Sequence, residues 1–269
     1  MKFKYFAFLA FLMPTMASAQ MKLKSFGTAK PIELTLGWED RKAAFVWYKG
    51  QKEPIALKFK SLTIDSSDRE SGQPNFNSYT FTEMYQGKAT GEYGFTEWPR
   101  NVDDIYYIRY KDGKKFKFEL VEDDETYDGK SMALLHQVQF HYYSFFKDSL
   151  KIVYPDGSTS NLLLNELDEG KNRRMKVKDY NFDGVDDISL DITSADGLNV
   201  AYDIFIYNRT TKKFNKLMQP KNTGCGEMVN LKIDKQRKEL TTMCKSGPKW
   251  NSFTYKFNKV GKLVLVRED

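Results

Sequence analysis

Short runs of alternating apolar and polar residues recur along the chain, and turn residues separate them. The clearest pair is Ile105 to Tyr110 and Phe116 to Val121, which flank an Asp112-Gly113 turn. Period-two alternation places side chains on opposite faces of a strand, and Asp-Gly is a favoured two-residue hairpin turn. Roughly sixteen such runs, about every eight to twelve residues, predict an all-β chain of consecutive antiparallel hairpins. The spacing favours a sandwich, barrel or propeller over alternating strands and helices.

One segment, Leu134 to Phe146, fits two periodicities. Alternate residues from Val138 to Tyr142 suit a strand, but a helix would also gather its apolar side chains on one face. We predict a strand, because a further hairpin follows around Pro155. His136 and His141 would then face opposite sides of that strand, which favours two half-buried histidines over a metal-binding pair.

Two predicted hairpins share a sequence pattern: a strand rich in aromatic residues, then a polar turn, then Lys-Lys-Phe. They span residues 106–116 and 202–214. Diverged blades of one propeller would look like this, and so would unrelated hairpins.

The first nineteen residues have the features of a secretory signal peptide. Lys2 and Lys4 form a positive start, Tyr5 to Met13 is apolar, and Ala17-Ser18-Ala19 fits the cleavage rule. We therefore expect cleavage after Ala19, so that the mature chain starts at Gln20. The apolar run is too short to span a bilayer. The expected location is the bacterial periplasm, without a membrane span.

Composition and charge narrow the class of partner. Removing Lys2 and Lys4 leaves 40 basic residues against 36 acidic ones, so the net charge falls from +6 to +4. The basic residues are scattered among the strands and form no stripe, which argues against a nucleic-acid partner. A charged break at residues 167–174 divides an N-terminal β region, 20–166, from a C-terminal one, 167–269, although both could form one propeller.

The stretch from Asp179 to Asp187 is the one motif with specific chemistry. Its alternate positions supply oxygen ligands for a hard cation, and a glycine stands where the loop must turn. The expected calcium ligands are Asp179, Asn181, Asp183, the Val185 carbonyl and Asp187.

The flanks of this stretch alternate with period two, so it joins strands and is not an EF-hand. Residue 190, where an EF-hand carries its glutamate, is Leu190. The alternative is an Asp/Asn/Gly-rich hairpin turn that binds nothing. Four carboxylates within nine residues favour calcium, because a divalent ion would remove their mutual repulsion.

The cysteines, Cys225 and Cys244, both lie in the exported part. In an oxidising compartment they should form a disulfide. No C-x-x-C motif is present, so a redox or metal role has little support.

The Asp179–Asp187 motif, followed by Tyr202 to Asn208 and Lys213-Phe214, resembles a family of exported bacterial proteins with a calcium-bearing β-propeller fold. Some members inhibit lysozyme-like enzymes. The resemblance, carried mainly by residues 170–269, implies a periplasmic inhibitor or immunity protein whose partner is a peptidoglycan hydrolase.

Inhibitors of this kind insert a Ser-Gly loop with a nearby aromatic residue into the enzyme. The matching positions are Ser246, Gly247 and Trp250, with Trp250 where tyrosine is typical. A rigid turn at Gly247-Pro248 is the alternative explanation.

Enzymatic activity has no motif to support it. The chain contains no G-x-S-x-G, no H-E-x-x-H and no Gly-rich phosphate loop. We therefore expect no catalytic residue and no enzyme activity. A binding protein fits better, and a structural or adhesion module of the envelope is the alternative.

Overall fold

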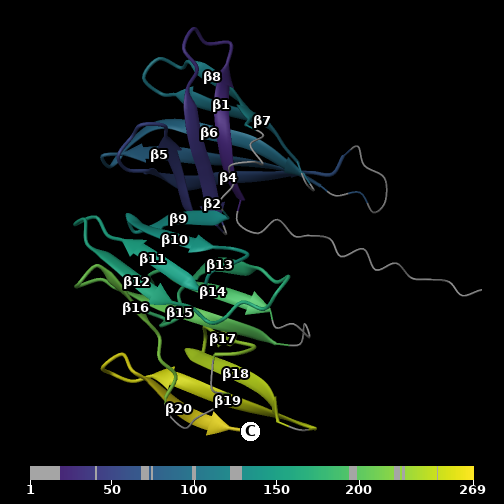
Figure 1. The fold of residues 1–269 in the computed structure, drawn as a ribbon, viewed down its shortest axis with the longest axis vertical. Coiled ribbons are helices and arrows are strands. Elements are labelled where there is room, and N and C mark those ends of the chain that lie inside the picture. The colour runs from purple at the N-terminus through teal and green to yellow at the C-terminus, as the bar shows by residue number, and fades with distance from the viewer. Residues whose placement is uncertain are drawn as a thin grey trace, which may run out of the picture.

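The computed structural model describes residues 19–39, 41–67, 73, 75–98, 101–121, 129–193, 199–220, 225, 228–246 and 248–269. These residues form twenty strands and no helix. Figure 1 shows a barrel at one end, below which three sheets are stacked to the C-terminus.

The first eight strands close into an antiparallel barrel in which each strand pairs with the next. Closure comes from β8 returning to β1, where Leu23 pairs with Leu120 and Phe26 with Lys117. The strands are β1 (Ala19–Phe26), β2 (Glu33–Glu39), β3 (Lys42–Tyr48), β4 (Ile55–Asp65), β5 (Phe76–Tyr85), β6 (Lys88–Trp98), β7 (Asn101–Arg109) and β8 (Lys115–Leu120).

Alternation along these strands fills the barrel with apolar and aromatic side chains. Tyr79, Phe81 and Phe95 stack on one another, and Trp38 packs against Phe95 at 4.5 Å between ring centroids. Tyr93 stacks on Tyr107. The barrel interior is therefore a packed aromatic core, as the 15% aromatic content suits.

One carboxylate is buried in this core. Glu83 on β5 is 4% exposed and accepts hydrogen bonds from Tyr48 Oη at 3.0 Å, Tyr107 Oη at 2.8 Å and Thr90 Oγ1 at 2.6 Å. Tyr93 Oη lies 2.6 Å from Tyr48 Oη and 3.4 Å from Glu83. Burial, together with the Glu83 carboxylate, raises the pKa of Tyr48 and Tyr107, so both phenols remain protonated donors.

The remaining strands form three four-stranded meanders. The first is β9 (Lys130–Leu135), β10 (Val138–Tyr143), β11 (Ser149–Val153) and β12 (Thr159–Leu163). The second is β13 (Arg173–Lys178), β14 (Asp187–Thr193), β15 (Val200–Asn208) and β16 (Lys213–Lys216). The third is β17 (Lys232–Asp234), β18 (Glu239–Ser246), β19 (Lys249–Phe257) and β20 (Leu263–Glu268).

Separate apolar cores join the layers. Phe45 of the barrel packs with Met132 and Leu134 of the first sheet. Phe140 and Phe205 belong to one core between the first and second sheets, which are thereby held together. A third core joins the second sheet to the third, and the stack is continuous from the barrel to the C-terminus.

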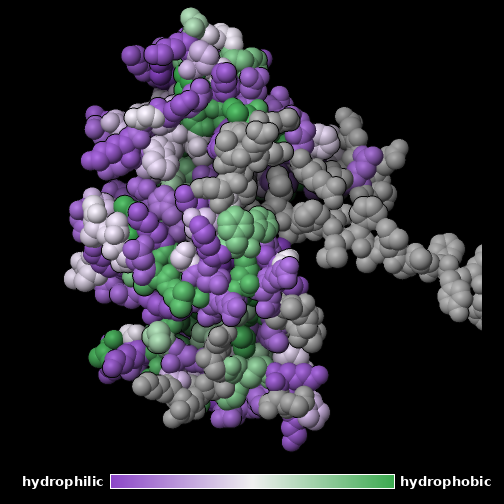
Figure 2. All heavy atoms as spheres, in the orientation of Figure 1, coloured by the Kyte–Doolittle hydropathy of each residue, from purple (hydrophilic) through white to green (hydrophobic). Residues whose placement is uncertain are grey.

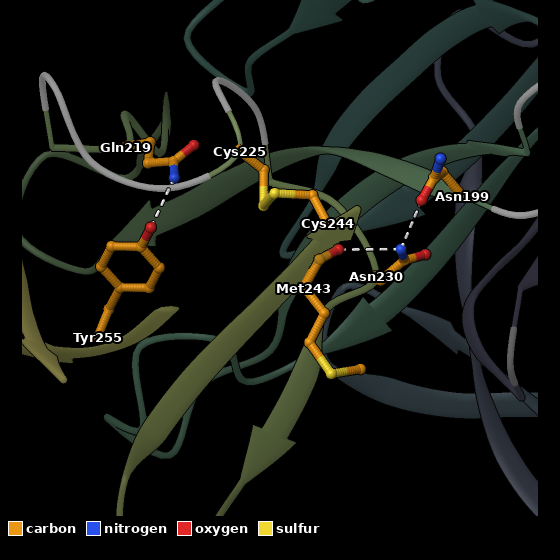
Figure 3. Close-up of a disulfide and its surroundings, with 7 residues drawn as sticks. All are labelled: Asn199, Gln219, Cys225, Asn230, Met243, Cys244 and Tyr255. Carbon is orange, nitrogen blue, oxygen red and sulfur yellow. Dashed lines mark hydrogen bonds between the residues drawn. A yellow bond between two sulfur atoms is a disulfide. The ribbon is translucent and has the colours of Figure 1, made fainter. Parts of the chain in front are cut away.

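A disulfide stabilises the third sheet (Figure 3). Cys225 and Cys244 are bonded, which confirms the predicted pair and ties the segment before β17 to β18. Beside it, Asn230 Nδ2 donates to the Met243 carbonyl at 3.0 Å. On the chain-entropy account, closing a loop of this length contributes roughly 3 kcal/mol to stability.

The predicted all-β class and the hairpin pattern are confirmed. The segment 134–146 contains strand and no helix, but the predicted single strand is wrong: Leu134 and Leu135 end β9, His136 lies in the turn before β10, and residues 144–146 form a bend after β10. The two hairpins that share a sequence pattern lie in different layers, since residues 106–116 belong to the barrel and residues 202–214 to the second sheet. The arrangement does not show a propeller. The charged segment 167–174 follows the first sheet and runs into β13 of the second, whose first residue is Arg173.

Hydrophilic side chains cover most of the face seen in Figure 2, with hydrophobic ones interspersed over the barrel and the sheets. Within the described residues, no helix is long and apolar enough to cross a membrane. The signal peptide predicted for residues 1–19 lies outside the described residues, apart from Ala19 in β1.

Candidate functional site

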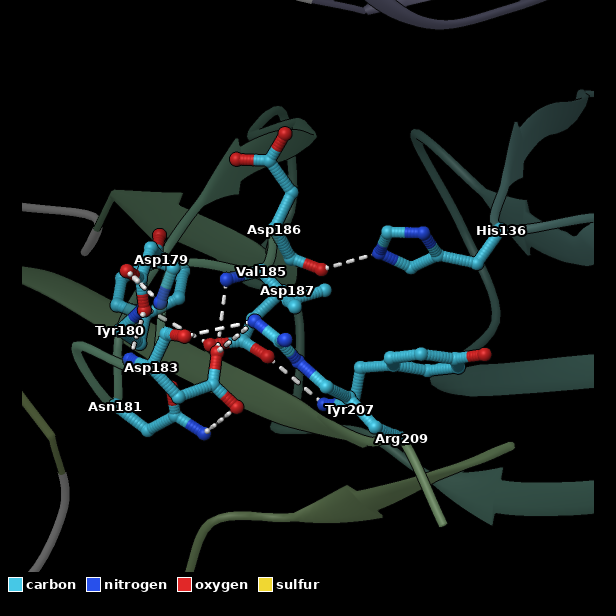
Figure 4. Close-up of polar contacts among 11 residues, drawn as sticks. His136, Asp179, Tyr180, Asn181, Asp183, Val185, Asp186, Asp187, Tyr207 and Arg209 are labelled. Atoms are coloured by element: carbon cyan, nitrogen blue, oxygen red, sulfur yellow. Dashed lines mark hydrogen bonds and ion pairs between the residues drawn. The ribbon is translucent and has the colours of Figure 1, made fainter. Parts of the chain in front are cut away.

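The Asp-rich loop connects β13 to β14 at one end of these strands in the second sheet (Figure 4). Asp179 opens it, and its carboxylate accepts the backbone N–H of Asp183 at 3.1 Å and that of Gly184 at 2.8 Å. Phe182 (φ 62°) and Gly184 (φ 82°) both lie in the left-handed region, so the chain folds back tightly. These bonds draw the loop around the Asp179 side chain.

The middle of the loop brings two further oxygen-bearing side chains together. The Asn181 Oδ1 accepts the N–H of Asp183 at 3.1 Å, and Asp183 Oδ1 accepts that of Val185 at 2.8 Å. Asn181 Nδ2 also donates to Asp183 Oδ2 at 3.2 Å. Local hydrogen bonds of this kind favour Asp and Asn in turns.

Asp187, the first residue of β14, is fully buried. Its carboxylate accepts the backbone N–H of Tyr180 at 2.9 Å and that of Tyr207 on β15 at 2.8 Å. Burial raises the pKa of this carboxyl to about 7, although both amide donors oppose the shift and Asp183 adds to it. A cation bound beside Asp187 would favour its ionised form.

The oxygen atoms of the Asp179–Asp187 loop could hold a hard cation only if groups other than carboxylates were among the ligands. In the described part of the chain, no three His, Cys, Asp or Glu side chains gather as a metal-binding group. The loop nevertheless supplies the Asn181 amide oxygen and the Val185 carbonyl, which are ordinary calcium ligands. The loop thus carries carboxylate, amide and carbonyl oxygens, which are the ligand types that calcium uses, and in this structure its carboxylates accept backbone hydrogen bonds within the loop.

The loop also touches the barrel and the other two sheets. Lys42 on β3 pairs with the Asp186 carboxylate at 2.6 Å. His136 donates its Nε2–H to the Asp186 carbonyl at 2.7 Å (Figure 4). The Phe182 ring packs edge-on against Phe257 of the third sheet, 6.5 Å between centroids. All four layers of the fold thus meet at this loop.

Two cationic or aromatic neighbours complete the surroundings of the loop. Arg209, just after β15, donates to the Asp183 carbonyl at 2.7 Å and lies 3.8 Å from its carboxylate. The His136 ring stacks on Tyr207 at 4.3 Å. Neither Lys42 nor His136 could be linked to the loop from the sequence, because no motif connects residues so far apart.

The predicted partner-binding positions lie at the β18–β19 hairpin. Ser246 ends β18 and pairs with Lys249, whereas Gly247 lies outside the described residues. Trp250 on β19 is 54% exposed and pairs with Lys245. This hairpin thus presents a large aromatic side chain to solvent, next to the strand position of Cys244.

Three acidic residues of the barrel, Glu83, Glu92 and Asp103, have aromatic neighbours but point to different places. Glu83 points into the barrel core, while Glu92 pairs with Lys60 at 2.5 Å on the outer face. Asp103 accepts the Trp98 indole N–H at 3.1 Å. These carboxylates therefore do not form a common site.

Comparison with known proteins leaves the family open. No protein-family model and no curated protein sequence matches this chain. What the fold and site define is a class: an all-β protein of one closed barrel and three stacked meanders, joined at an Asp-rich loop.

Proposed function

We propose that the chain is an exported, calcium-stabilised binding protein. The observation that carries this proposal is the contact of the Asp179–Asp187 loop with all four layers. An ion held in the loop would fix the barrel and the three sheets relative to one another. Rigid scaffolds bind through exposed loops at a low entropic cost.

The partner we propose is a periplasmic peptidoglycan-cleaving enzyme, which the protein inhibits. Two features support it beside the sequence resemblance. The exposed Trp250 is a suitable anchor on a hairpin, and the Cys225–Cys244 disulfide stiffens its base. Each of the three sheets is a four-stranded antiparallel meander, which is the strand order of a single propeller blade.

The test is capture from periplasmic extract on the immobilised mature chain, followed by turbidity assays of each hydrolase recovered. Trp250→Ala should weaken inhibition about thirtyfold, since truncating a desolvated aromatic anchor commonly costs about 2 kcal/mol. Val260→Ala is the matched control, because Val260 is 77% exposed in the opposite turn of the same sheet. It should leave inhibition unchanged.

The outcomes separate the candidate functions. Equal inhibition by Trp250→Ala and wild type would move the contact away from this hairpin. If no hydrolase is retained or inhibited at micromolar protein, the proposed inhibitor or immunity function is rejected. The alternative is then a non-enzymatic structural or adhesion role in the envelope.

A further inference from the structure

A hollow of about 540 Å³ lies on the outer face of the barrel, far in sequence from the Asp-rich loop. Its floor follows one row of the sheet: Thr80 pairs with Gly94, Gly94 with Tyr106, Tyr106 with Lys117, and Lys117 with Phe26. Directly paired residues share a face, so five adjacent strands contribute to one surface. The volume falls within the range of small-molecule sites.

The centre of the row depends on a glycine. A Cβ on Gly94 would lie 2.3 Å from the Tyr106 ring, so only glycine lets this ring lie against β6. The Lys115 ammonium sits over the same ring, 4.1 Å from its centroid. The aromatic ring therefore positions a cation in the hollow.

The acidic residue that lines the hollow, Asp104, lies at a β-bulge. The pairing of β6 with β7 slips by one residue, because Gly94 faces Tyr106 while Thr96 faces Asp103. The extra residue, Asp104, is exposed and has φ 52°, in the left-handed region. Bulges of this kind redirect a side chain, and here the redirected residue, Asp104, is the acidic residue that lines the hollow.

The polar groups of the hollow remain available. Neither Lys117 nor Asp104 forms an ion pair with any other residue that the structure describes. Ser78 and Thr96 bond to each other at 2.9 Å through their hydroxyls, which can make further bonds outward. Phe26, 48% exposed, adds an apolar edge.

These groups specify the chemistry of a ligand. A neutral sugar would leave Lys115 and Lys117 without an anionic partner, whereas a simple polyanion would be repelled by Asp104. A ligand with both an acid group and several hydroxyl groups satisfies all of them: the lysines hold the acid, and Asp104 with the hydroxyl side chains bonds the O–H groups.

We propose that this outer face of the barrel binds an acidic carbohydrate, with Lys115 and Lys117 at the acid group and Asp104 at the sugar hydroxyls. The acid is either a carboxylate, as in a uronic acid, or a phosphate. This site is separate from the β18–β19 hairpin and independent of the hydrolase partner.

Calorimetric titration of the intact mature chain at low salt tests the site with three probes: trigalacturonate, glucose 6-phosphate and maltotriose. We expect one or both acidic probes to bind more tightly than maltotriose, and the one that binds identifies the acid. The double variant Lys115→Ala/Lys117→Ala should weaken that binding about tenfold or more, because charge-assisted hydrogen bonds are lost.

The matched control is Lys88→Ala/Lys111→Ala, which removes the same charge from exposed barrel positions outside the hollow. It should change affinity less than about twofold, since exposed charges at a distance are screened. If both double variants weakened binding equally, the loss of affinity would reflect net charge alone, and the proposed site would be overturned. Equal affinity for maltotriose, or the absence of binding by both acidic probes at millimolar concentration, would also overturn it.

Discussion

His136 donates its Nε2–H to the backbone carbonyl of Asp186 over 2.7 Å, and through this bond the β9–β10 turn holds the Asp-rich loop. His136 (φ 52°) and Gln137 (φ 63°) both adopt the left-handed conformation, so the turn is of the tight two-residue hairpin type. The strained turn aims the imidazole at the loop, where its ring also stacks on Tyr207. A contact between the first and second sheets is thus built into the loop itself.

His136→Ala should destabilise the protein by about 1–3 kcal/mol, through loss of one partly buried hydrogen bond and one ring stack. His136→Phe keeps a ring for Tyr207 but lacks the donor, so it should recover part of that loss. Urea unfolding of the three proteins measures both effects. If both variants unfold with the wild-type midpoint and slope, the bond does not support the sheets.

Calcium should raise the melting temperature of the wild-type protein. An ion that binds only the folded chain stabilises it by about 2.7 kcal/mol at a hundred times its Kd. Asp183→Ala removes one proposed ligand and should abolish most of this increase. Thermal unfolding in calcium and in chelator is the measurement.

The neighbouring Asp186→Ala is the control for that experiment. Its carboxylate pairs with Lys42 and is not among the proposed ligands, so calcium should still raise the melting temperature of this variant. Identical wild-type melting curves in calcium and chelator would remove calcium from the proposed function.

The buried Asp187 should make the stability of the chelated protein depend on pH. Its folded-state pKa is raised from 3.8 to about 7, so its stabilising contribution is complete below pH 3.8 and is lost as pH rises through 7. The slope is at most about 1.4 kcal/mol per pH unit, the value for one proton. Urea unfolding in chelator should therefore show lower stability at about pH 8 than at about pH 5.

Bound calcium should suppress this dependence, because a cation favours the ionised carboxylate. Other groups titrate in both conditions, so the difference between the calcium and chelator curves reports the loop. That difference should grow with pH. Parallel curves would show that Asp187 does not titrate with the metal.

Local features of the fold were accessible from the sequence. The Asp112-Gly113 turn lies between β7 and β8 as predicted, since short-range turn chemistry decides its position. The predicted two-residue turn is wrong, because the Arg109 N–H bonds to the Lys114 carbonyl and the loop between them is longer. The Cys225–Cys244 disulfide could be predicted because both cysteines lie in the exported part and the expected compartment is oxidising. The β9–β10 turn escaped detection because His136-Gln137 lacks the Gly or Asn that usually marks such a turn.

Features that depend on long-range pairing were not accessible. Barrel closure requires Leu23 to pair with Leu120, and alternation alone does not distinguish a closed barrel from an open sheet. The ion pair of Lys42 with Asp186 spans 144 positions, and no local pattern announces it. The sequence therefore indicated the loop and its ligand types, but not that the loop would join all four layers.

The position of Glu83 inside the barrel leads to the last prediction. Four hydroxyl groups surround this buried carboxylate, three of which donate to it at 3.0 Å or less. Glu83→Ala removes the acceptor and leaves buried donors unsatisfied, each at a cost of roughly 1–3 kcal/mol, so a loss of about 3 kcal/mol or more is expected.

Glu83→Gln separates the hydrogen bonds from the volume of the side chain. Glutamine keeps the size and one acceptor oxygen, and the Tyr48–Tyr93 hydroxyl pair, 2.6 Å apart, can rotate to accept from its amide. It should therefore lose less stability than Glu83→Ala. Glu92→Ala, on the outer face of β6, is the control, since its ion pair with Lys60 should contribute at most about 1 kcal/mol. If Glu83→Ala is no more destabilising in urea than Glu92→Ala, the hydroxyl groups have found other partners, and the buried carboxylate does not hold this part of the barrel together.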